Sequence, residues 1–401
     1  MKGPLKFLRS GKIHGLNTIG PLYEWFEGSS TLVIEEASFQ GKQGTILVYY
    51  NPPVHQVGNP ALDAYLEGLD KVLQKKEAFR FLLLYGANDP VHAGGDLKES
   101  LEKLDKTLAV KKGKEKAGAP AEEIDRLYDW ADRRLEKGVA LHSRLRSLAQ
   151  RLRVVSVCGG GTRFGGSAEI PLMADFLVGD SRSGMCFSEA MIGLLPGWSG
   201  VARALVKAGP QNTRYMALTG KEVKAEALKA IGIFNAVVDI PFVFPKMERT
   251  ADPKADQAAY LETLEKHDED TGMILIPKAM EIATCEEAQI PPARAPVALA
   301  SEEAILEEVE RRKNPQTYAH LWGKLLREVS EEIRRLGRPL APQSVEALSA
   351  LIASYDRSRF DERDFVKREA EVDARLYRDP RFRAGLVATL EQKVADYRGV
   401  S

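Results

Sequence analysis

The chain has 401 residues, more than one ordinary hydrophobic core accommodates, so its length predicts two or three modules. Its 57 basic and 57 acidic residues cancel, which argues against a nucleic-acid binder. No apolar run reaches the roughly 18 residues of a membrane span, and residues 1–6 lack the apolar stretch of a signal peptide. Three scattered cysteines and six scattered histidines argue against a disulfide framework and a metal site. We expect a cytoplasmic protein without metal, nucleic-acid or membrane partners.

The first part of the chain predicts a strand, a helix and a second strand. Residues 1–30 contain spaced glycines and predict an irregular lead-in. A β-rich run, Thr45–Tyr50, precedes leucines at helical spacing over residues 60–77. The apolar run Phe79–Tyr85 then predicts a buried strand. This order is typical of a βαβ unit with a right-handed crossover.

The middle of the chain predicts helices and a second βαβ element. Residues 97–150 are polar with mostly helical periodicity, and the basic stretch Val110–Lys116 predicts a solvated loop between helices. A strand at Val154–Val157, a glycine loop at Gly159–Gly166 and a short helix at Ala168–Met173 follow. Repeated β-then-α segments favour an α/β fold.

These patterns divide the chain into four consecutive regions. The lead-in is followed by an α/β core over residues 31–240, with an insertion at about 100–140. Residues 241–300 contain several prolines and predict a linker or surface insertion. Residues 301–401 have helical periodicity and predict an all-α module, whose first helix Ser301 can cap.

Two glycine-rich loops follow buried strands, at Ala93–Lys98 and at Gly159–Glu169. Glycine lets a backbone approach a ligand closely, and amides at a helix start point toward negative charge. One amide from each loop could therefore converge on one oxygen and form an oxyanion hole. The alternative is that these glycines only serve turns that need positive φ.

Glu169 follows the second loop, and Glu189 lies 20 residues later, beyond a predicted strand. Both carboxylates could border one pocket, where one acts as a base and the other as an acid. The alternative is that each is an ordinary surface glutamate. Two other motifs fail: the third glycine of a dinucleotide fingerprint comes one position late, and a nucleophile elbow around Ser167 lacks its last glycine.

Taken together, the loops, their separation and the second glutamate resemble the crotonase (enoyl-CoA hydratase/isomerase) superfamily. The resemblance covers about residues 31–240 and 355–397. The matching stretches are NPALDAYLEGLDKVLQKKEAFRFLLLYG, HAGGDLKES, GTRFGGSAEIPLMADFLVGD, FSEAMIGLLPGWSG, LTGKEVKAEALKAIGIFNAVV and RDPRFRAGLVATLEQK. It implies an α/β fold with a crotonase-like ββα spiral core, a C-terminal all-α module and two insertions.

Roles for individual residues also follow from this resemblance. Gly95 and Gly166 match the oxyanion-hole residues whose amides hold a thioester oxygen. Glu169 matches the glutamate that activates water, and Glu189 matches the one that moves the proton at the carbon next to the thioester. The positions that match CoA-binding and substrate-binding ones are Ala93, Gly94, Asp96, Leu97, Lys98, Arg163, Gly165, Pro196 and Gly197.

By resemblance, we expect an acyl-CoA hydratase that adds water across the α,β double bond of an enoyl-CoA thioester. The acyl group of this substrate can be bulky or cyclic. Such an enzyme needs no cofactor beyond the coenzyme A of its substrate. The alternatives are an acyl-CoA hydrolase of the thioester or ring-opening C–C type, an enoyl-CoA isomerase, and a catalytically inactive binding subunit. Ser167 departs from the family's usual glycine, and Arg163 departs from a small residue.

The C-terminal apolar stripes have two interpretations. The resemblance implies that the helical module joins subunits into a homotrimer or hexamer. The alternative is that the same stripes fold back on the chain's own core. The residues concerned are Trp322, Leu325, Leu326, Leu348, Leu351, Ile352 and Phe365.

Overall fold

A computed structural model describes residues 4–86, 91–245, 252–286 and 296–398 of the chain. Compactness divides the chain into two units, and each unit contains three separate segments. Unit 1 comprises Met1–Gly94, Ala140–Met185 and Glu222–Val297, and unit 2 comprises Gly95–Val139, Cys186–Lys221 and Ala298–Ser401.

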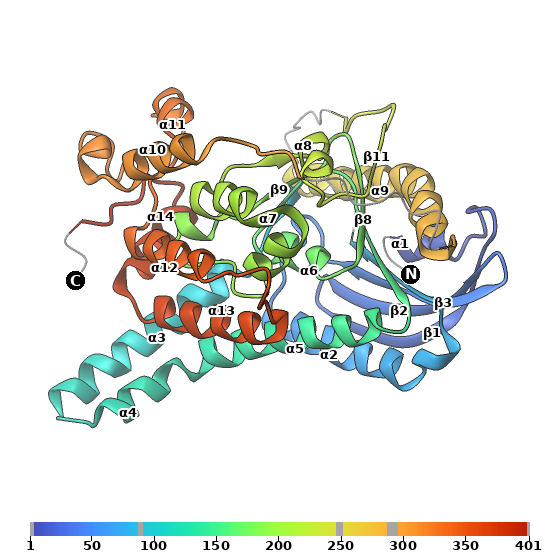
Figure 1. Ribbon diagram of the computed structural model, residues 1–401, viewed down its shortest axis with the longest axis horizontal. Helices are drawn as coiled ribbons and strands as arrows, with labels where there is room; N and C mark the ends of the chain where they lie inside the picture. The colour runs from blue at the N-terminus through green and yellow to red at the C-terminus, as the bar shows by residue number, and fades with distance from the viewer. Residues whose placement is uncertain (1–3, 87–90, 246–251, 287–295, 399–401) are drawn as a thin grey trace. The chain divides into compact units, whose positions relative to one another are not determined.

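Unit 1 is built on a mixed sheet with the strand order β1-β2-β3-β4-β6-β8-β11 (Figure 1). The strands β1 to β3 pair antiparallel, and every later pair in the order is parallel. Parallel neighbours require crossover connections, so the α/β fold class predicted from the alternating segments is confirmed. The strands are β1 (Leu16–Glu27), β2 (Ser30–Phe39), β3 (Lys42–Tyr50), β4 (Phe81–Gly86), β6 (Arg153–Cys158), β8 (Phe176–Asp180) and β11 (Ala236–Val238).

The prediction of an irregular stretch over residues 1–30 is wrong. This segment contains helix α1 (Pro4–Leu8) and the edge strand β1. The register of β1 against β2 shifts near Gly20 and again after Pro21. These bulges interrupt the alternation of buried and exposed residues, which is the only local signal of an edge strand.

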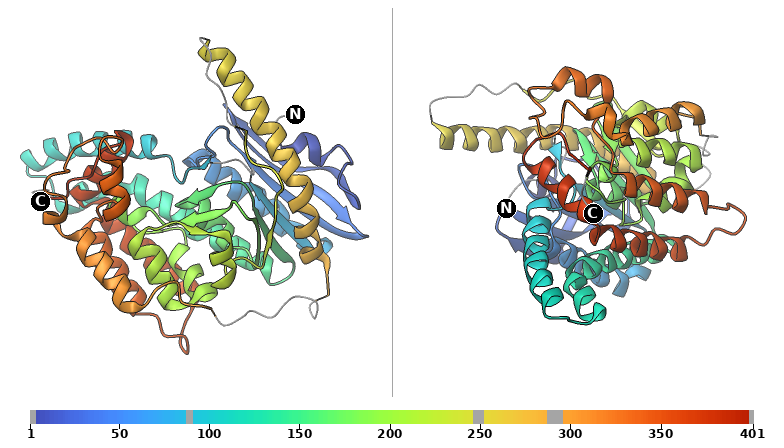
Figure 2. Two further views of the ribbon diagram at one scale, coloured as in Figure 1. Left: turned by 90° about the horizontal axis from the view of Figure 1, so that it is seen from above. Right: turned by 90° about the vertical axis from the view of Figure 1, so that its left-hand side faces the viewer.

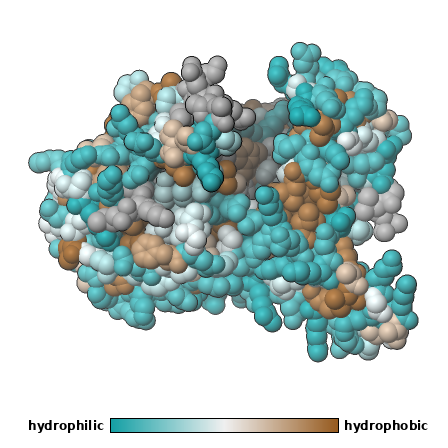
Figure 3. Space-filling model, turned by 180° about the vertical axis from the view of Figure 1, so that it is seen from behind, coloured by the Kyte–Doolittle hydropathy of each residue, from teal (hydrophilic) through white to brown (hydrophobic). Residues whose placement is uncertain are grey.

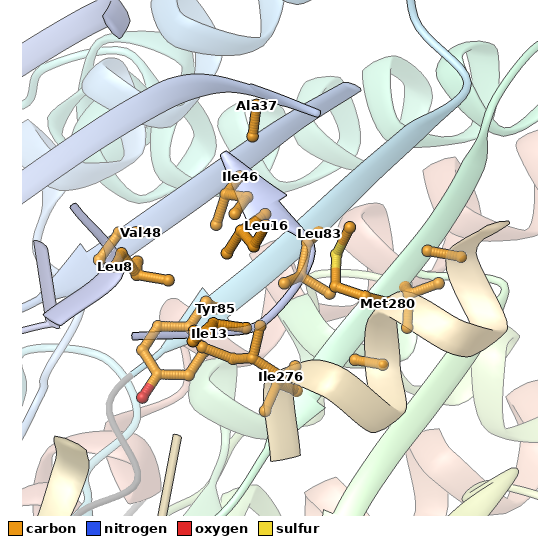
Figure 4. Close-up of a cluster of buried hydrophobic side chains, with 14 of the residues drawn as sticks. Leu8, Ile13, Leu16, Ala37, Ile46, Val48, Leu83, Tyr85, Ile276 and Met280 are labelled. Atoms are coloured by element: carbon orange, nitrogen blue, oxygen red, sulfur yellow. The ribbon is translucent and has the colours of Figure 1, made fainter. Parts of the chain in front are cut away.

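Alternate residues of the sheet face two different layers of helices, as the two-residue period of a strand requires. On one face, Ile46, Leu83 and Tyr85 meet Ile276 and Met280 of helix α9 in the main hydrophobic cluster (Figure 4). On the other face lies α2 (Asn59–Gln74). Gly68 of α2 allows this approach, because a Cβ there would lie 2.8 Å from Ile34 Cδ1.

Helix α9 (Pro253–Thr284) occupies most of the segment whose prolines predicted a linker or surface insertion. Pro253 stands in its first turn, where proline is tolerated, and the Asp252 side chain caps it. Pro277 lies inside the helix, in the half that is buried against the sheet. Figure 2 shows α9 running along the sheet of unit 1. Burial of its apolar stripe therefore outweighs the local cost of Pro277.

A second, small sheet joins the two glycine loops within unit 1. Its strand order is β10-β9-β7-β5, with β10 at Val223–Lys224, β9 at Gly184–Cys186, β7 at Thr162–Phe164 and β5 at Val91–His92. The parallel pair β5 and β7 sets His92 opposite Arg163. The short helices α6 (Gly166–Leu172) and α8 (Ala225–Ala230) complete the unit, with the 3₁₀ turn η1 (Lys76–Ala78).

Unit 2 is helical in its described part. The basic stretch Val110–Lys116, predicted as a loop, forms the last turns of α3, because lysine and glutamate favour helix and the side chains reach solvent. The elements are α3 (Leu97–Lys116), α4 (Ala121–Asp125), η2 (Arg126–Tyr128), α5 (Asp129–Ala149, whose end belongs to unit 1), η3 (Glu189–Met191), α7 (Gly200–Thr219), α10 (Glu302–Lys313), η5 (Pro315–Tyr318), α11 (Ser330–Leu336), α12 (Pro342–Ala353), α13 (Glu362–Tyr377) and α14 (Pro380–Leu390).

The C-terminal helices follow their sequence signals closely. Ser301 caps α10 by accepting from the Ala304 amide at 3.2 Å, as predicted. Leu348, Leu351 and Phe365 are buried within the chain, which agrees with a tail that folds back. The face shown in Figure 3 is mostly hydrophilic, with separate hydrophobic patches. None of the described helices is long and apolar enough to cross a membrane.

Candidate active site

The first glycine loop is anchored by backbone hydrogen bonds to the turn that follows β3. The Ala93 amide donates to the Val54 carbonyl at 2.7 Å, and the Gly94 carbonyl accepts from the Val57 amide at 3.0 Å. The N–H of a trans peptide points opposite to its C=O. The amide of Gly95 is therefore directed away from Val57.

The glycines of the two loops are required for different reasons. Gly160 and Gly165 have positive φ of 89° and 49°, so they serve turns. Gly94, Gly95 and Gly166 have no positive φ, so another constraint must act there. At Gly94 that constraint is space: a Cβ would lie 2.9 Å from the Phe164 carbonyl oxygen and 3.3 Å from the Gly166 nitrogen.

Ser167 ties the two loops together within unit 1. Its hydroxyl donates to the carbonyl of Ala93 in a short hydrogen bond. With the Gly94 contact, this bond holds the first loop beside the start of α6. The departure from the family's usual glycine thus has a structural consequence in this chain.

The amides of Gly95 and Gly166 have no hydrogen-bond partner among the residues that the structure describes. Gly166 is buried and is the first residue of α6, where helix geometry leaves N–H groups without an acceptor. Gly95 is half-buried. Donors without partners are rare in such places and cost about 1–3 kcal/mol each, so they are available to an acceptor on a ligand.

Both predicted catalytic glutamates are buried, so the alternative that they are surface residues is wrong. Glu169 is 3% exposed on α6 of unit 1, and Glu189 is 8% exposed at the start of η3 in unit 2. Buried carboxylates need partners or a function, because desolvation disfavours their charge. Whether they face a common void stays a prediction.

The segment that carries Glu189 is held by the C-terminal part of unit 2. The Ala341 amide donates to the Ala190 carbonyl at 2.8 Å, and the Tyr397 hydroxyl donates to the Met191 carbonyl at 2.5 Å. Burial raises the pKa of Tyr397, so the phenol stays a donor. The tail therefore supports the backbone on which Glu189 stands.

Two buried acids of α13, which sequence reasoning missed, bind the segment after Glu189. Asp373 binds the loop at Leu195 and Glu369 binds the first turn of α7. The Leu195 amide donates to Asp373 Oδ1 at 3.0 Å, and the Ala202 amide donates to Glu369 Oε2 at 2.9 Å. A Cβ at Gly197 would lie 2.5 Å from Asp373 Oδ2, so this position requires glycine. The available signal was two acids one helical turn apart among apolar residues of α13.

The other predicted ligand-binding positions are less uniform. Asp96 caps α3, accepting from the Lys98 and Glu99 amides at 3.0 Å each, while the Lys98 side chain is exposed. Ala93, Gly94, Arg163 and Gly165 lie in unit 1, and Asp96, Leu97, Lys98, Pro196 and Gly197 lie in unit 2. A binding role for these residues stays a prediction.

Arg163 is buried, with its guanidinium in contact with β5 and the second loop. Its Nη1 lies 3.1 Å from His92 Nδ1, and its Nη2 donates to the Gly159 carbonyl at 3.4 Å. Because arginine only donates, His92 accepts through Nδ1. A cavity of about 40 Å³ adjoins this pair, with Tyr65 and Ser167 in its lining. It has room for roughly two or three water molecules and none for an acyl chain.

Two comparisons of the sequence each match part of the chain. Residues 113–243 match the model of the enoyl-CoA hydratase/isomerase family. A carnitinyl-CoA dehydratase of Proteus mirabilis (strain HI4320) is 30% identical over 98 residues, which span 24% of this chain and only 38% of that relative.

Two solved structures share the fold. An enoyl-CoA hydratase from Rhodobacter sphaeroides 2.4.1 has 15% identity and a TM-score of 0.53, with 86% of each chain covered. A carnitinyl-CoA dehydratase from Mycobacterium thermoresistibile has 15% identity and a TM-score of 0.51, over 89% of this chain and 91% of that one. At this identity the likeness extends to the fold alone.

Proposed function

We propose that the chain is a member of the crotonase superfamily, supported by the family model that matches residues 113–243 and by the shared fold, and that it is an acyl-CoA hydratase that adds water across the α,β double bond of an enoyl-CoA thioester. The observation that carries the proposal is the pair of amides at Gly95 and Gly166, which have no hydrogen-bond partner in the described part of the chain and stand on two loops that touch each other. In this proposal both amides donate to the thioester oxygen, and coenzyme A enters only as part of the substrate.

The chemistry follows from where charge develops. Water attacks the β carbon, and the electron pair of the double bond moves onto the thioester oxygen as an enolate. Fixed amides stabilise that charge without reorganising, and each such donor contributes a factor of about 10²–10³ in rate. Glu169 takes a proton from the water and Glu189 delivers one to the α carbon, after which proton exchange with solvent restores both carboxyl groups.

The same groups catalyse the reverse reaction, loss of water from a hydroxyacyl-CoA. Dehydration is the activity in the names of the Proteus relative and of the Mycobacterium structure. A thioester hydrolase on this fold would instead release free thiol. These outcomes separate in one assay, because hydration removes the absorbance of the unsaturated thioester and leaves the thioester bond intact.

The first prediction concerns the two glutamates. Glu169→Gln and Glu189→Gln should each lower turnover by about 10²–10⁴, the usual contribution of a positioned acid or base, with little change in thermal unfolding. The measurement is enoyl-CoA absorbance with a parallel thiol assay. Glu226→Gln, at an exposed position on α8, is the matched control. Near-wild-type turnover in both site variants would show that the roles are wrong, and thiol release by wild type would favour a thioester hydrolase.

The homotrimer or hexamer implied by the family and the cytoplasmic location stay proposals. Burial of Leu348, Leu351 and Phe365 within unit 2 leaves these side chains little surface to offer another subunit. Mass measurement in solution decides the subunit number.

A further inference from the structure

A buried arginine lies where a side chain on Gly95 would stand, next to the residue whose amide we propose holds the thioester oxygen. Arg134, on α5, is 3% exposed and belongs to unit 2 together with Gly95. A Cβ built on Gly95 would lie 2.4 Å from Arg134 Nη2. The guanidinium thus fills the space that a side chain at position 95 would need, which explains a glycine there without positive φ.

The guanidinium is held in place from two elements. The ring of Trp198 lies 5.0 Å from Arg134 Cζ in a cation–π contact, and Gly138 allows that ring to approach α5, because a Cβ there would lie 2.3 Å from it. Glu99 of α3 lies 3.7 Å from Arg134 Nη1 and also pairs with Lys103 at 2.6 Å. Such contacts restrict the rotamers of a long side chain, so its charge has a defined position.

A fixed, buried cation acts strongly on a nearby anion, because little water screens it. An oxygen that accepts from the Gly95 amide forms beside the residue that Arg134 touches. We propose that Arg134 is a further catalytic residue, which contacts the enolate oxygen and stabilises its negative charge together with the Gly95 amide. The inference rests on the proposed function, and it adds a full positive charge to a hole otherwise made of peptide dipoles.

Loss of Arg134 should affect kcat and KM differently. The thioester oxygen is nearly neutral in the bound substrate and negative in the enolate, so Arg134 discriminates between these two states. Its removal should therefore lower kcat much more than it raises KM. If Arg134 only supported the fold, its replacement would lower thermal stability but would not lower kcat much more than it raises KM.

The test uses the full-length protein and acetoacetyl-CoA, a ligand whose enolate absorbs light and can be titrated while bound. Arg134→Gln should raise the apparent pKa of enolisation of the bound ligand by about one to three, the effect of losing one opposite charge at contact distance. It should also lower kcat for hydration by about 10–10³. Arg134→Met provides a second replacement in case Arg134→Gln does not fold. Arg134→Lys keeps a positive charge and should recover part of the enolate signal.

Arg133→Gln is the matched control, since it removes the same charge from an exposed neighbour on the same helix. It should leave both the enolate titration and kcat at wild-type values. Folded Arg134→Gln and Arg134→Met proteins that titrate the ligand like wild type would overturn the role of Arg134 and leave the proposed function standing. A wild-type protein that neither hydrates enoyl-CoA nor binds the enolate would overturn the proposed function, and the role of Arg134 with it.

Discussion

At the scale of single residues, Ser167 shows how one hydroxyl couples two loops that are far apart in sequence. It donates to Ala93, one residue before the Gly94 contact with the second loop. The position of Gly94 relative to Gly166 therefore depends on a side chain that itself has no chemical step to perform. Small displacements of positioned groups are costly in catalysis, about 10²-fold for 1 Å.

Ser167→Ala should lower kcat by about tenfold or more, because it releases the first loop, while the Ala93 carbonyl loses its donor at a cost of about 1–3 kcal/mol. Ser167→Thr keeps the hydroxyl and should recover most of the loss. The measurements are kcat, KM and the thermal midpoint of all three proteins. Wild-type kcat in Ser167→Ala would mean that the loop is held adequately by its backbone hydrogen bonds alone.

At the scale of elements, the C-terminal tail is part of the support of the candidate site. Tyr397 and Ala341, the residue before α12, donate to the carbonyls of Met191 and Ala190, and Asp373 of α13 accepts from the loop that follows. A tail that only joined subunits would not make these contacts with its own chain. Loss of one of these tail contacts should therefore lower activity, although it removes no group proposed to act in the reaction.

Tyr397→Phe should lower stability by about 1–3 kcal/mol near neutral pH, because the Met191 carbonyl loses a buried donor, and should lower kcat modestly. Burial raises the pKa of Tyr397 above its ordinary value of 10.0. The neutral phenol therefore stabilises the fold fully below about pH 10, and this contribution is lost as pH rises above that value.

The stability difference between wild type and Tyr397→Phe should accordingly narrow in thermal unfolding as the pH rises from 10 to 12. Tyr355→Phe, whose ring packs against Phe360, is the control. A difference that stays constant over this range would contradict the assigned burial of the phenol.

At the scale of the whole molecule, the chain passes between the two units five times, since each consists of three separate segments. Neither unit can form from one continuous stretch of sequence. The residues of the proposed reaction are divided between them, with Gly166 and Glu169 in unit 1 and Gly95 and Glu189 in unit 2. Folding of both is therefore a condition for activity.

This connectivity predicts a single cooperative thermal transition with equal calorimetric and van't Hoff enthalpies, as for one domain. Loss of enoyl-CoA hydration should coincide with that transition. Differential scanning calorimetry with a parallel activity assay measures both. Two separated transitions would show that the units fold independently in spite of the interlaced chain.

Local patterns in the sequence located most elements, whereas the roles of the residues in the proposed reaction came from the family resemblance and stay predictions. Period-two and helical spacing located β3, β4, α2, α12 and α13, and the glycine loops with Glu169 and Glu189 were visible as motifs. The same patterns failed for β1, whose bulges break its alternation, and for α9, whose prolines indicated a linker. In both, packing against the sheet outweighed the local preference.

What only the tertiary structure decided is which distant groups meet. The sequence determined where a strand, a helix or a flexible glycine can stand, because such preferences depend on neighbours along the chain. It could not show that Arg134 lies against Gly95, that Ser167 binds Ala93 or that Asp373 orders the loop at Leu195. Those contacts join residues separated by tens to hundreds of positions, and they arise only when burial brings the elements together.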